Sequence, residues 1–365
     1  MNPFWSRIAR ELSPYVPGEQ PRAADLVKLN TNESPFGPSP LAVEAMRAAV
    51  ADTMRLYPDP EATELREALA AHHGVRPEQV FVGNGSDEVL AHAFVALLKQ
   101  PQPLLFPDVT YSFYPVWAQL FDVAHKTVPL DGDMCVRVED YRREAGSVVI
   151  ANPNAPTGVA LPRAAVSRLL DEHPDIPVLI DEAYVDFGGE SAVPLIADHA
   201  NLLIVQTMSK SRALAGLRVG YALGDAGLID ALRRVKDSFN SYPLGRVAQA
   251  GATASVRDDA YFRESCARIV AGREAMTREL IGLGFAVLPS SANFVFARHP
   301  ARDGAEFAAA LRERAVLVRH FNKPRTASYL RITVGTENDT RRLVAAAADI
   351  LGGYPREMTA APTHA

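Results

Sequence analysis

Lys210 follows a short apolar run at the start of a polar segment, a position where a lysine can carry covalent chemistry. The run 202–205 is too short and continuous for an amphipathic helix, so it predicts a buried strand ending at a sheet rim. Open α/β sheets bind their ligands at that rim. Thr207, Ser209 and Arg218 flank the lysine. They predict an anion site beside an amine nucleophile, with a surface lysine in a turn as the alternative.

A second apolar run, 80–82, leads into the segment 83–88, where two glycines precede an acidic first helical turn. Free backbone N–H groups at a helix N-terminus are a ready site for phosphate. Ser86 and Asp87 lie in this turn and are expected to complete the phosphate site. The segment lacks the third glycine of a dinucleotide-binding fingerprint, and an ordinary strand-to-helix turn is the alternative.

Three further strand ends carry polar or aromatic side chains. Asp181 and Tyr184 follow the run 178–180, and a carboxylate emerging from a buried strand is costly without a charged or hydrogen-bonded partner. A protonated heterocyclic nitrogen would be such a partner. Asn154 lies in a proline-rich loop and Tyr111 follows another strand. A helix N-cap, a plain turn and a core aromatic ring are the respective alternatives.

One cofactor would use all of these groups, namely pyridoxal 5′-phosphate. Its phosphate would occupy the predicted anion site. Tyr111 would stack on its ring, and Asp181 would pair with its pyridinium nitrogen. Asn154 and Tyr184 would supply amide and hydroxyl donors, and Lys210 the amine that condenses with its aldehyde. The protein's part in such chemistry is to hold the ring, set its protonation and place an amine beside the aldehyde.

The elements that position these residues follow from the alternation of short apolar runs with helical patterns between residues 45 and 268. This alternation predicts an α/β fold with a mostly parallel central sheet flanked by helices. Apolar residues at helical spacing over 258–283 predict a long helix that bridges two domains. The strands are expected at 80–82, 104–106, 148–151, 178–180, 202–205 and 219–223, and later at 285–288, 294–296, 316–318 and 329–334.

The chain is expected to divide into a large cofactor-binding domain at 45–268 and a small α+β domain at 269–352. The small domain includes a helix over 304–314. An N-terminal arm at 1–44 is rich in proline and glycine, which favours an extended segment lying over another surface. The polar segment 353–365 is predicted to be disordered.

The bulk composition favours small-molecule chemistry. The formal net charge is −5, and the basic residues are scattered, which gives no footprint for nucleic acid or an anionic membrane. The two cysteines, Cys135 and Cys266, cannot form a disulfide framework, and no Cys/His grouping has the spacing of a metal site. Neither a signal-peptide pattern nor a run of 18 apolar residues occurs. These features predict a cytoplasmic enzyme without a metal.

The ordered motifs resemble those of the fold type I aminotransferases (class II of the pyridoxal-phosphate-dependent aminotransferases), and within them the histidinol-phosphate aminotransferase family. The resemblance covers residues from about 12 to about 351, through segments 29–38, 57–59, 83–88, 152–158, 181–184, 209–218 and 330–335. It implies an aspartate-aminotransferase-like fold. It also implies an obligate homodimer in which Tyr57 reaches the cofactor phosphate of the partner subunit. Tyr15, Asn30, Arg319 and Arg331 are implied to line the substrate pocket, with Arg331 binding the anionic group.

The same resemblance implies transfer of an amino group between L-histidinol phosphate and 2-oxoglutarate or glutamate, a step of histidine biosynthesis. Lys210, Asp181 and Tyr184 would be the catalytic residues. An aromatic amino-acid aminotransferase stays open as an alternative, because a pocket that holds imidazole beside an arginine could also hold a phenyl ring and a carboxylate. A threonine-phosphate decarboxylase, a close relative that shares most of these motifs, is the less favoured alternative. A regulatory module that binds pyridoxal phosphate is disfavoured because no basic helix-turn-helix segment precedes residue 40. Segment 241–246 departs from the common family pattern near the expected substrate entrance.

Overall fold

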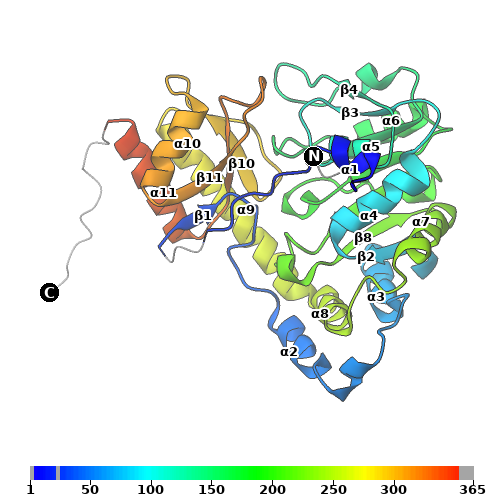
Figure 1. Ribbon diagram of the computed structural model, residues 1–365. Helices are drawn as coiled ribbons and strands as arrows, with labels where there is room; N and C mark the ends of the chain where they lie inside the picture. The colour runs from blue at the N-terminus through cyan, green and yellow to red at the C-terminus, as the bar shows by residue number, and fades with distance from the viewer. Residues whose placement is uncertain (1–3, 22–24, 353–365) are drawn as a thin grey trace.

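The computed structural model describes residues 4–21 and 25–352, which form two sheets with helices packed against them (Figure 1). The larger sheet has the strand order β2-β8-β7-β6-β5-β3-β4, and the smaller sheet has the order β1-β11-β12-β10-β9. The large-sheet strands are β2 (Val80–Gly83), β3 (Leu104–Pro107), β4 (His125–Val128), β5 (Ser147–Ala151), β6 (Val178–Asp181), β7 (Leu202–Thr207) and β8 (Gly220–Gly224). The small-sheet strands are β1 (Val27–Leu29), β9 (Ala286–Val287), β10 (Phe294–Arg298), β11 (Val316–His320) and β12 (Leu330–Thr333).

Eleven α-helices are present in the described part of the chain. They are α1 (Arg7–Glu11), α2 (Pro40–Ala49), α3 (Thr63–His73), α4 (Gly85–Ala93), α5 (Tyr114–Leu120), α6 (Arg163–Glu172), α7 (Ala226–Phe239), α8 (Arg246–Arg257), α9 (Asp259–Gly282), α10 (Gly304–Glu313) and α11 (Glu337–Ile350). Short helical turns connect them at η1 (Asp52–Arg55), η2 (Pro77–Gln79), η3 (Phe94–Leu98), η4 (Val138–Tyr141), η5 (Val185–Phe187), η6 (Val193–Ala197) and η7 (Ala215–Leu217). None of the helices in residues 4–21 and 25–352 combines the length and apolar character needed to cross a bilayer.

The central sheet is mostly parallel, as predicted, but β8 runs against both of its neighbours, β2 and β7. The connection from β7 to β8 contains only the short turn η7 and no crossover helix. A parallel pair needs a longer crossover, usually helical, so this connection returns the chain antiparallel to β7. The strand expected at 219–223 is therefore present, in the opposite direction to the other central strands.

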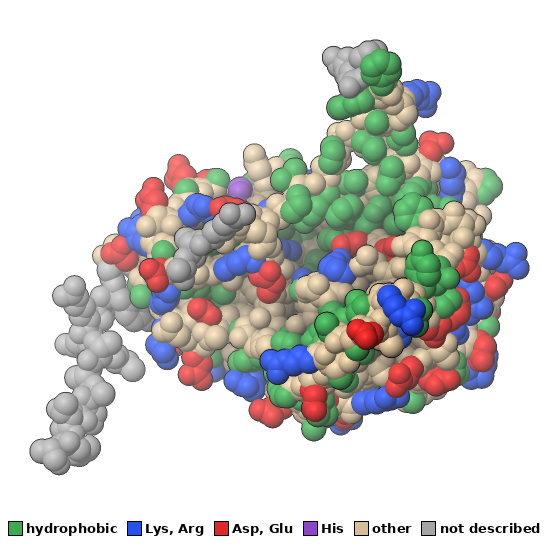
Figure 2. All heavy atoms as spheres, turned by 60° about the horizontal axis from the view of Figure 1, so that its bottom comes forward, with side chains coloured by type: hydrophobic (Ala, Val, Ile, Leu, Met, Phe, Trp, Pro, Cys, Tyr) green, Lys and Arg blue, Asp and Glu red, His purple; other side chains and the backbone are tan. Residues whose placement is uncertain are grey.

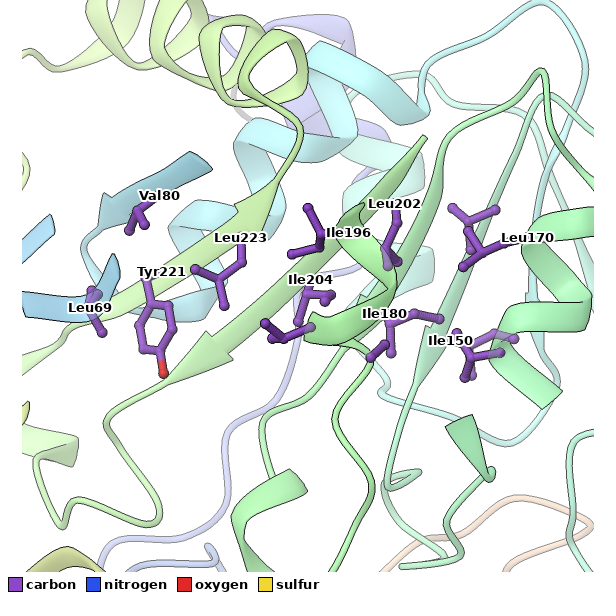
Figure 3. Packing of buried hydrophobic residues seen from close by; sticks show 14 of the residues in the cluster. Leu69, Val80, Ile150, Leu170, Ile180, Ile196, Leu202, Ile204, Tyr221 and Leu223 are labelled. Carbon is purple, nitrogen blue, oxygen red and sulfur yellow. The ribbon is translucent and has the colours of Figure 1, made fainter. Parts of the chain in front are cut away.

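The central strands are buried on both faces, which explains their continuous apolar sequences. Ile150, Ile180 and Ile204 point into one core cluster, shown in Figure 3. The alternate residues Leu179 and Leu203 point into a second cluster on the opposite face. Two packed faces hold the strand ends in fixed positions, and the predicted polar residues follow those ends.

Two strands were not expected from the sequence. β1 lies within the predicted extended arm and pairs in parallel with β11, so the arm is partly built into the small sheet. β4 forms one edge of the large sheet, and its first three residues, from His125 to Thr127, are exposed. Neither segment has an apolar run long enough to signal a strand.

The long helix α9 was predicted, and Figure 1 shows it running from the large sheet toward the small one. Its buried residues Ile269, Met276 and Leu280 join the core beneath the small sheet. The arrangement confirms a large domain with a mostly parallel sheet plus a small α+β domain. The domain limits at 45, 268 and 352 stay predictions, and the predicted disorder of 353–365 lies outside the described residues.

Candidate functional site

A cavity of about 470 Å³ opens where the central parallel strands end, between the two sheets and the arm. Every predicted site residue except Asn154 and Tyr57 lines it. Those that line it are Tyr15, Asn30, Ser86, Asp87, Tyr111, Asp181, Tyr184, Thr207, Ser209, Lys210, Arg218, Arg319 and Arg331. Strand ends, a helix N-terminus, the arm and the small sheet all contribute, and the lining residues Tyr15 and Arg331 are 316 positions apart in the chain.

Lys210 lies just past β7 in the wall of this cavity. Its Nζ donates to the backbone carbonyl of Thr31 at 3.2 Å. Burial of the amine and the nearby charge of Arg331 lower the pKa of Lys210 to about 8, against the opposing influence of Glu33 and Asp87. A lysine with a lowered pKa supplies a larger fraction of neutral, nucleophilic amine near neutral pH.

Asp181 is the last residue of β6 and is 4% exposed. Its carboxylate accepts hydrogen bonds from the Tyr114 hydroxyl at 2.8 Å and from the Ala183 backbone N–H at 3.2 Å. Within the described residues no Lys, Arg or His lies within ion-pair distance of it. Burial therefore raises the pKa of Asp181 to about 6, although both hydrogen bonds oppose this. Such a carboxylate fits a cationic ring nitrogen as its missing partner.

The N-terminus of α4 and the side chain of Arg218 form one end of the cavity. Arg218 reaches Asp87 Oδ2 at 3.2 Å through Nη2, and its Nη1 lies 3.5 Å from Ser209 Oγ. Asp87 also accepts from the Tyr111 hydroxyl at 3.0 Å, so one carboxylate orients both the guanidinium and the ring. Gly85 has a φ of +80°, and a Cβ there would lie 2.4 Å from Arg218 Nη2. The guanidinium and the free N–H groups of α4 together suit a phosphate.

A second cationic region faces the cavity from the small sheet. Arg319 and Arg331 are directly opposite each other on the antiparallel strands β11 and β12. Like charges in this position destabilise a sheet, so the pair is better explained by binding an anion than by stability. The Nε of Arg331 is buried and has no hydrogen-bond partner within the described residues, while its Nη2 donates to the Asn30 carbonyl at 2.9 Å. Burial also lowers the pKa of Arg331.

The two remaining predicted residues lie outside the cavity wall. The amide of Asn154 donates to the Val109 carbonyl at 2.9 Å and accepts from the Thr110 hydroxyl at 3.0 Å, so it braces the segment leading to Tyr111. Tyr57 is 78% exposed and stacks on Tyr242 with 4.7 Å between ring centroids. A direct cofactor contact by Asn154 and a contact by Tyr57 across a dimer both stay predictions.

Several lining or supporting residues were not singled out from the sequence. They are Thr31, Asn32, Glu33, Phe113 and Tyr114. Tyr15 stacks on Phe113 at 4.4 Å, and Lys28 pairs with Glu33. The motif 29–38 was recognised as a whole without a chemical role for each residue. Tyr114 gave no signal because an aromatic residue in a helix is indistinguishable from a core residue until its hydroxyl partner is known.

Comparisons with known proteins agree with this geometry. The chain matches the family model for aminotransferase class I and II over residues 24–346. It is 63% identical to histidinol-phosphate aminotransferase 1 of Bradyrhizobium diazoefficiens, over 94% of this chain and 98% of that protein. It is 61% identical to histidinol-phosphate aminotransferase 2 of Rhizobium meliloti, over 96% of this chain and 100% of that protein.

Solved structures give the same picture. The histidinol-phosphate aminotransferase from Sinorhizobium meliloti in complex with pyridoxal-5′-phosphate matches with a TM-score of 0.85 and 26% identity, over 96% of this chain and 98% of that chain. An aspartate aminotransferase variant from Thermus thermophilus matches with a TM-score of 0.81 and 24% identity, over 96% and 100%. The second likeness concerns the fold alone.

Proposed function

Because the chain belongs to the aminotransferase class I and II family, we propose that it uses pyridoxal phosphate to move an amino group between L-histidinol phosphate and 2-oxoglutarate. One observation carries this proposal. The amine of Lys210 lies in a cavity that has one cationic region at Arg218 and a second at Arg319 and Arg331. The first suits a cofactor phosphate, and the second suits a substrate that is itself anionic.

The residues present fit the cofactor. Ser86, Thr207, Ser209 and Arg218 would hold the phosphate at the N-terminus of α4, and Tyr111 would cover the ring. Asp181 would keep the ring nitrogen protonated, because a buried carboxylate is stabilised by a cation at hydrogen-bonding distance. When bound, pyridoxal phosphate supplies the carbonyl that captures the substrate amine and the ring that accepts the electron pair of the broken Cα–H bond.

Lys210 would act as the proton carrier. Its neutral form would accept the proton from the substrate Cα, and its protonated form would hold that proton at Nζ and return it. A pKa of about 8 is close enough to neutral pH for both forms to be accessible. Tyr184, whose ring centroid lies 6.0 Å from Lys210 Nζ, would donate a hydrogen bond to the ring oxygen.

Arg331, assisted by Arg319, would bind the anionic end of each substrate. The phosphate of L-histidinol phosphate and a carboxylate of glutamate both accept a forked pair of hydrogen bonds from a planar guanidinium. Tyr15 and Asn30 would line the same pocket. The two substrates can therefore use one site in turn.

We also propose that the enzyme is a homodimer. A run of exposed apolar side chains extends from α2 to Tyr57, which is unusual for the surface of a monomer. Its members and their exposed fractions are Leu41 (53%), Val50 (67%), Met54 (51%), Leu56 (49%) and Tyr57 (78%). Figure 2 turns the lower side of Figure 1 forward and shows hydrophobic side chains at several places on this face, most of them gathered in its upper part beside a hollow. A cytoplasmic location stays a prediction.

The substrate is tested by a half-reaction. Purified protein loaded with pyridoxal phosphate is mixed with L-histidinol phosphate, L-phenylalanine or L-threonine phosphate, and the visible absorption of the cofactor is followed. Rapid conversion to the pyridoxamine form by L-histidinol phosphate alone is the expected result. Faster conversion by L-phenylalanine would replace the proposal with an aromatic aminotransferase. Loss of carboxylate from L-threonine phosphate, detected as released carbon dioxide, would replace it with a decarboxylase.

A further inference from the structure

Asn32 lies in the cavity wall, is 1% exposed and has a left-handed φ of 56°. Its backbone N–H donates to Thr333 Oγ1 at 3.0 Å, and its carbonyl accepts from Asn293 Nδ2 at 3.0 Å. A non-glycine residue in this region persists only where its surroundings hold it there. Here the end of β12 and the segment before β10 supply that support. The side chain of Asn32 is therefore held in one place.

The direction of the Asn32 amide follows from counting donors and acceptors. The Thr333 hydroxyl has one proton, and it donates that proton to Asn32 Oδ1 at 3.1 Å. If the amide were reversed, two N–H groups of Asn32 would point at Thr333. The buried hydroxyl proton would then lack an acceptor in the described part of the chain, which is costly. Asn32 Oδ1 therefore faces Thr333, and Asn32 Nδ2 faces the Tyr184 hydroxyl at 2.9 Å.

This direction sets the role of Tyr184. Because Asn32 Nδ2 is a donor only, the Tyr184 oxygen must accept from it, and the tyrosine proton must point elsewhere. No acceptor for that proton occurs within residues 4–21 and 25–352, and Tyr184 lines the cavity. We propose that Asn32 is a positioning residue that acts through Tyr184 and turns its hydroxyl proton into the cavity, toward the ring oxygen of the bound cofactor. This inference rests on the proposed function.

The same hydrogen bond strengthens the donor. A hydroxyl that accepts one hydrogen bond is polarised by it and therefore donates a stronger hydrogen bond of its own. Burial raises the pKa of Tyr184, and both Arg331 and the hydrogen bond from Asn32 act in the opposite direction. The directed series from Thr333 through Asn32 to Tyr184 thus ends at the cofactor ring and joins β12 of the small sheet to the site.

Three variants test the series, with the absorption spectrum of the cofactor-loaded protein titrated against pH as the readout. Asn32→Gly removes the amide and keeps the backbone, because glycine adopts a φ of 56° without strain. Asn32→Asp replaces the donor with an acceptor, so Tyr184 would donate to it and turn away from the ring. Thr333→Val removes the hydroxyl that orients the amide and tests the series should an Asn32 variant fold poorly.

In Asn32→Gly the Tyr184 hydroxyl loses the donor that orients it, and its hydrogen bond to the charged ring oxygen weakens. The spectral midpoint is therefore expected to move upward by about one pH unit. We expect a larger shift in Asn32→Asp and a smaller one in Thr333→Val. In each variant kcat should fall while KM for L-histidinol phosphate stays near the wild-type value. The hydrogen bonds of the Asn32 side chain go to Thr333 and Tyr184, not to the arginines proposed to bind the substrate's anionic group. Thr253→Val and Asn201→Asp are matched controls outside the cavity. The Thr253 hydroxyl donates to the backbone carbonyl of Gln249, and the Asn201 amide donates to two other backbone carbonyls. Both should keep the wild-type midpoint.

The decisive comparison uses Tyr184→Phe as the background. Asn32→Gly should produce no further shift there, because its effect passes through the tyrosine hydroxyl. An equal shift with and without that hydroxyl, or an unshifted midpoint in Asn32→Gly itself, would overturn the inference. Failure of the proposed function has a different signature, since wild-type protein would then neither bind pyridoxal phosphate nor convert L-histidinol phosphate.

Discussion

The Lys210 amine shows how one environment creates both reactivity and a cost to stability. The burial that lowers its pKa to about 8 disfavours the protonated form in the folded protein relative to the unfolded chain. Each pH unit of displacement corresponds to about 1.4 kcal/mol, so the lysine destabilises the cofactor-free protein by on the order of 1 to 3 kcal/mol at pH 7. The burial that makes this amine reactive therefore also lowers the free energy of unfolding of the cofactor-free protein.

We predict that Lys210→Met stabilises the cofactor-free protein and abolishes turnover. The stabilisation should be complete below about pH 8, where the amine is protonated in both states. It should disappear as the pH rises toward the ordinary lysine value of 10.5, because the unfolded chain then loses its proton too. Urea denaturation at pH 7 and pH 10 measures the difference. Lys99→Met, at an exposed amine, is the control, and a cofactor-free wild type as stable as Lys210→Met at pH 7 would contradict the prediction.

At the scale of the elements, the approach of α4 to Arg218 decides the shape of the anion site. The helix begins at Gly85, and its first residues face the start of β8, where a Cβ on Gly220 would lie 2.2 Å from the Ser86 nitrogen. Two glycines thus let a helix N-terminus, a strand end and a guanidinium meet in one place. A side chain at either glycine would push these groups apart.

We predict that Gly85→Ala weakens cofactor binding by roughly ten- to a hundredfold, the equivalent of a lost charged hydrogen bond. The new Cβ would displace the Arg218 guanidinium. Gly74→Ala is a matched control, because Gly74 has a similar φ of +68° but no atom within 4 Å of the added Cβ. Both variants should lose about 1 kcal/mol of unfolding free energy through left-handed strain. Equal cofactor affinities of the two variants, measured by fluorescence titration, would rule out the steric explanation.

At the scale of the whole molecule, the cavity combines groups from both sheets and the arm, and the proposed homodimer would add Tyr57 from the partner. Gln249 donates to the Asp59 carbonyl at 2.8 Å and Arg246 to the Tyr57 carbonyl at 3.1 Å, so the backbone carrying Tyr57 is held by α8 while its ring is exposed. An exposed ring on a fixed backbone is suited to contact a second copy of the chain.

We predict that two inactive variants restore activity when their subunits are mixed. Lys210→Ala lacks the amine, and Tyr57→Ala lacks the ring that each subunit would lend to the other. A mixed dimer would contain one site with both groups, built from the Lys210 of one subunit and the Tyr57 of the other. Activity after subunit exchange should exceed that of either variant alone. Unchanged activity in a mixture with demonstrated heterodimers would show that Tyr57 serves its own subunit or none.

Much of the site was accessible from the sequence because its chemistry is local to strand ends. Asp181, Lys210 and the turn at Ser86 each follow a short apolar run, and parallel strands bring such ends to one edge of a sheet. The resemblance to a family then added Arg319 and Arg331, which no strand-end argument identifies. β1 and β4 were missed because three or four residues of mixed polarity carry no periodic signal.

The sequence by itself determined most of the strands, the amine of Lys210 and the buried carboxylate of Asp181, since these depend on neighbours within a few residues. Only the tertiary structure decided the proposed direction of the Tyr184 hydroxyl and the way Arg218, Arg319 and Arg331 are arranged around one cavity. The Thr333 to Asn32 bond joins residues 301 positions apart, and the bond from Asn32 to Tyr184 joins residues 152 apart. A hydrogen bond has a direction only when both partners are held at a set distance, and packing of the two sheets, not sequence spacing, sets that distance here.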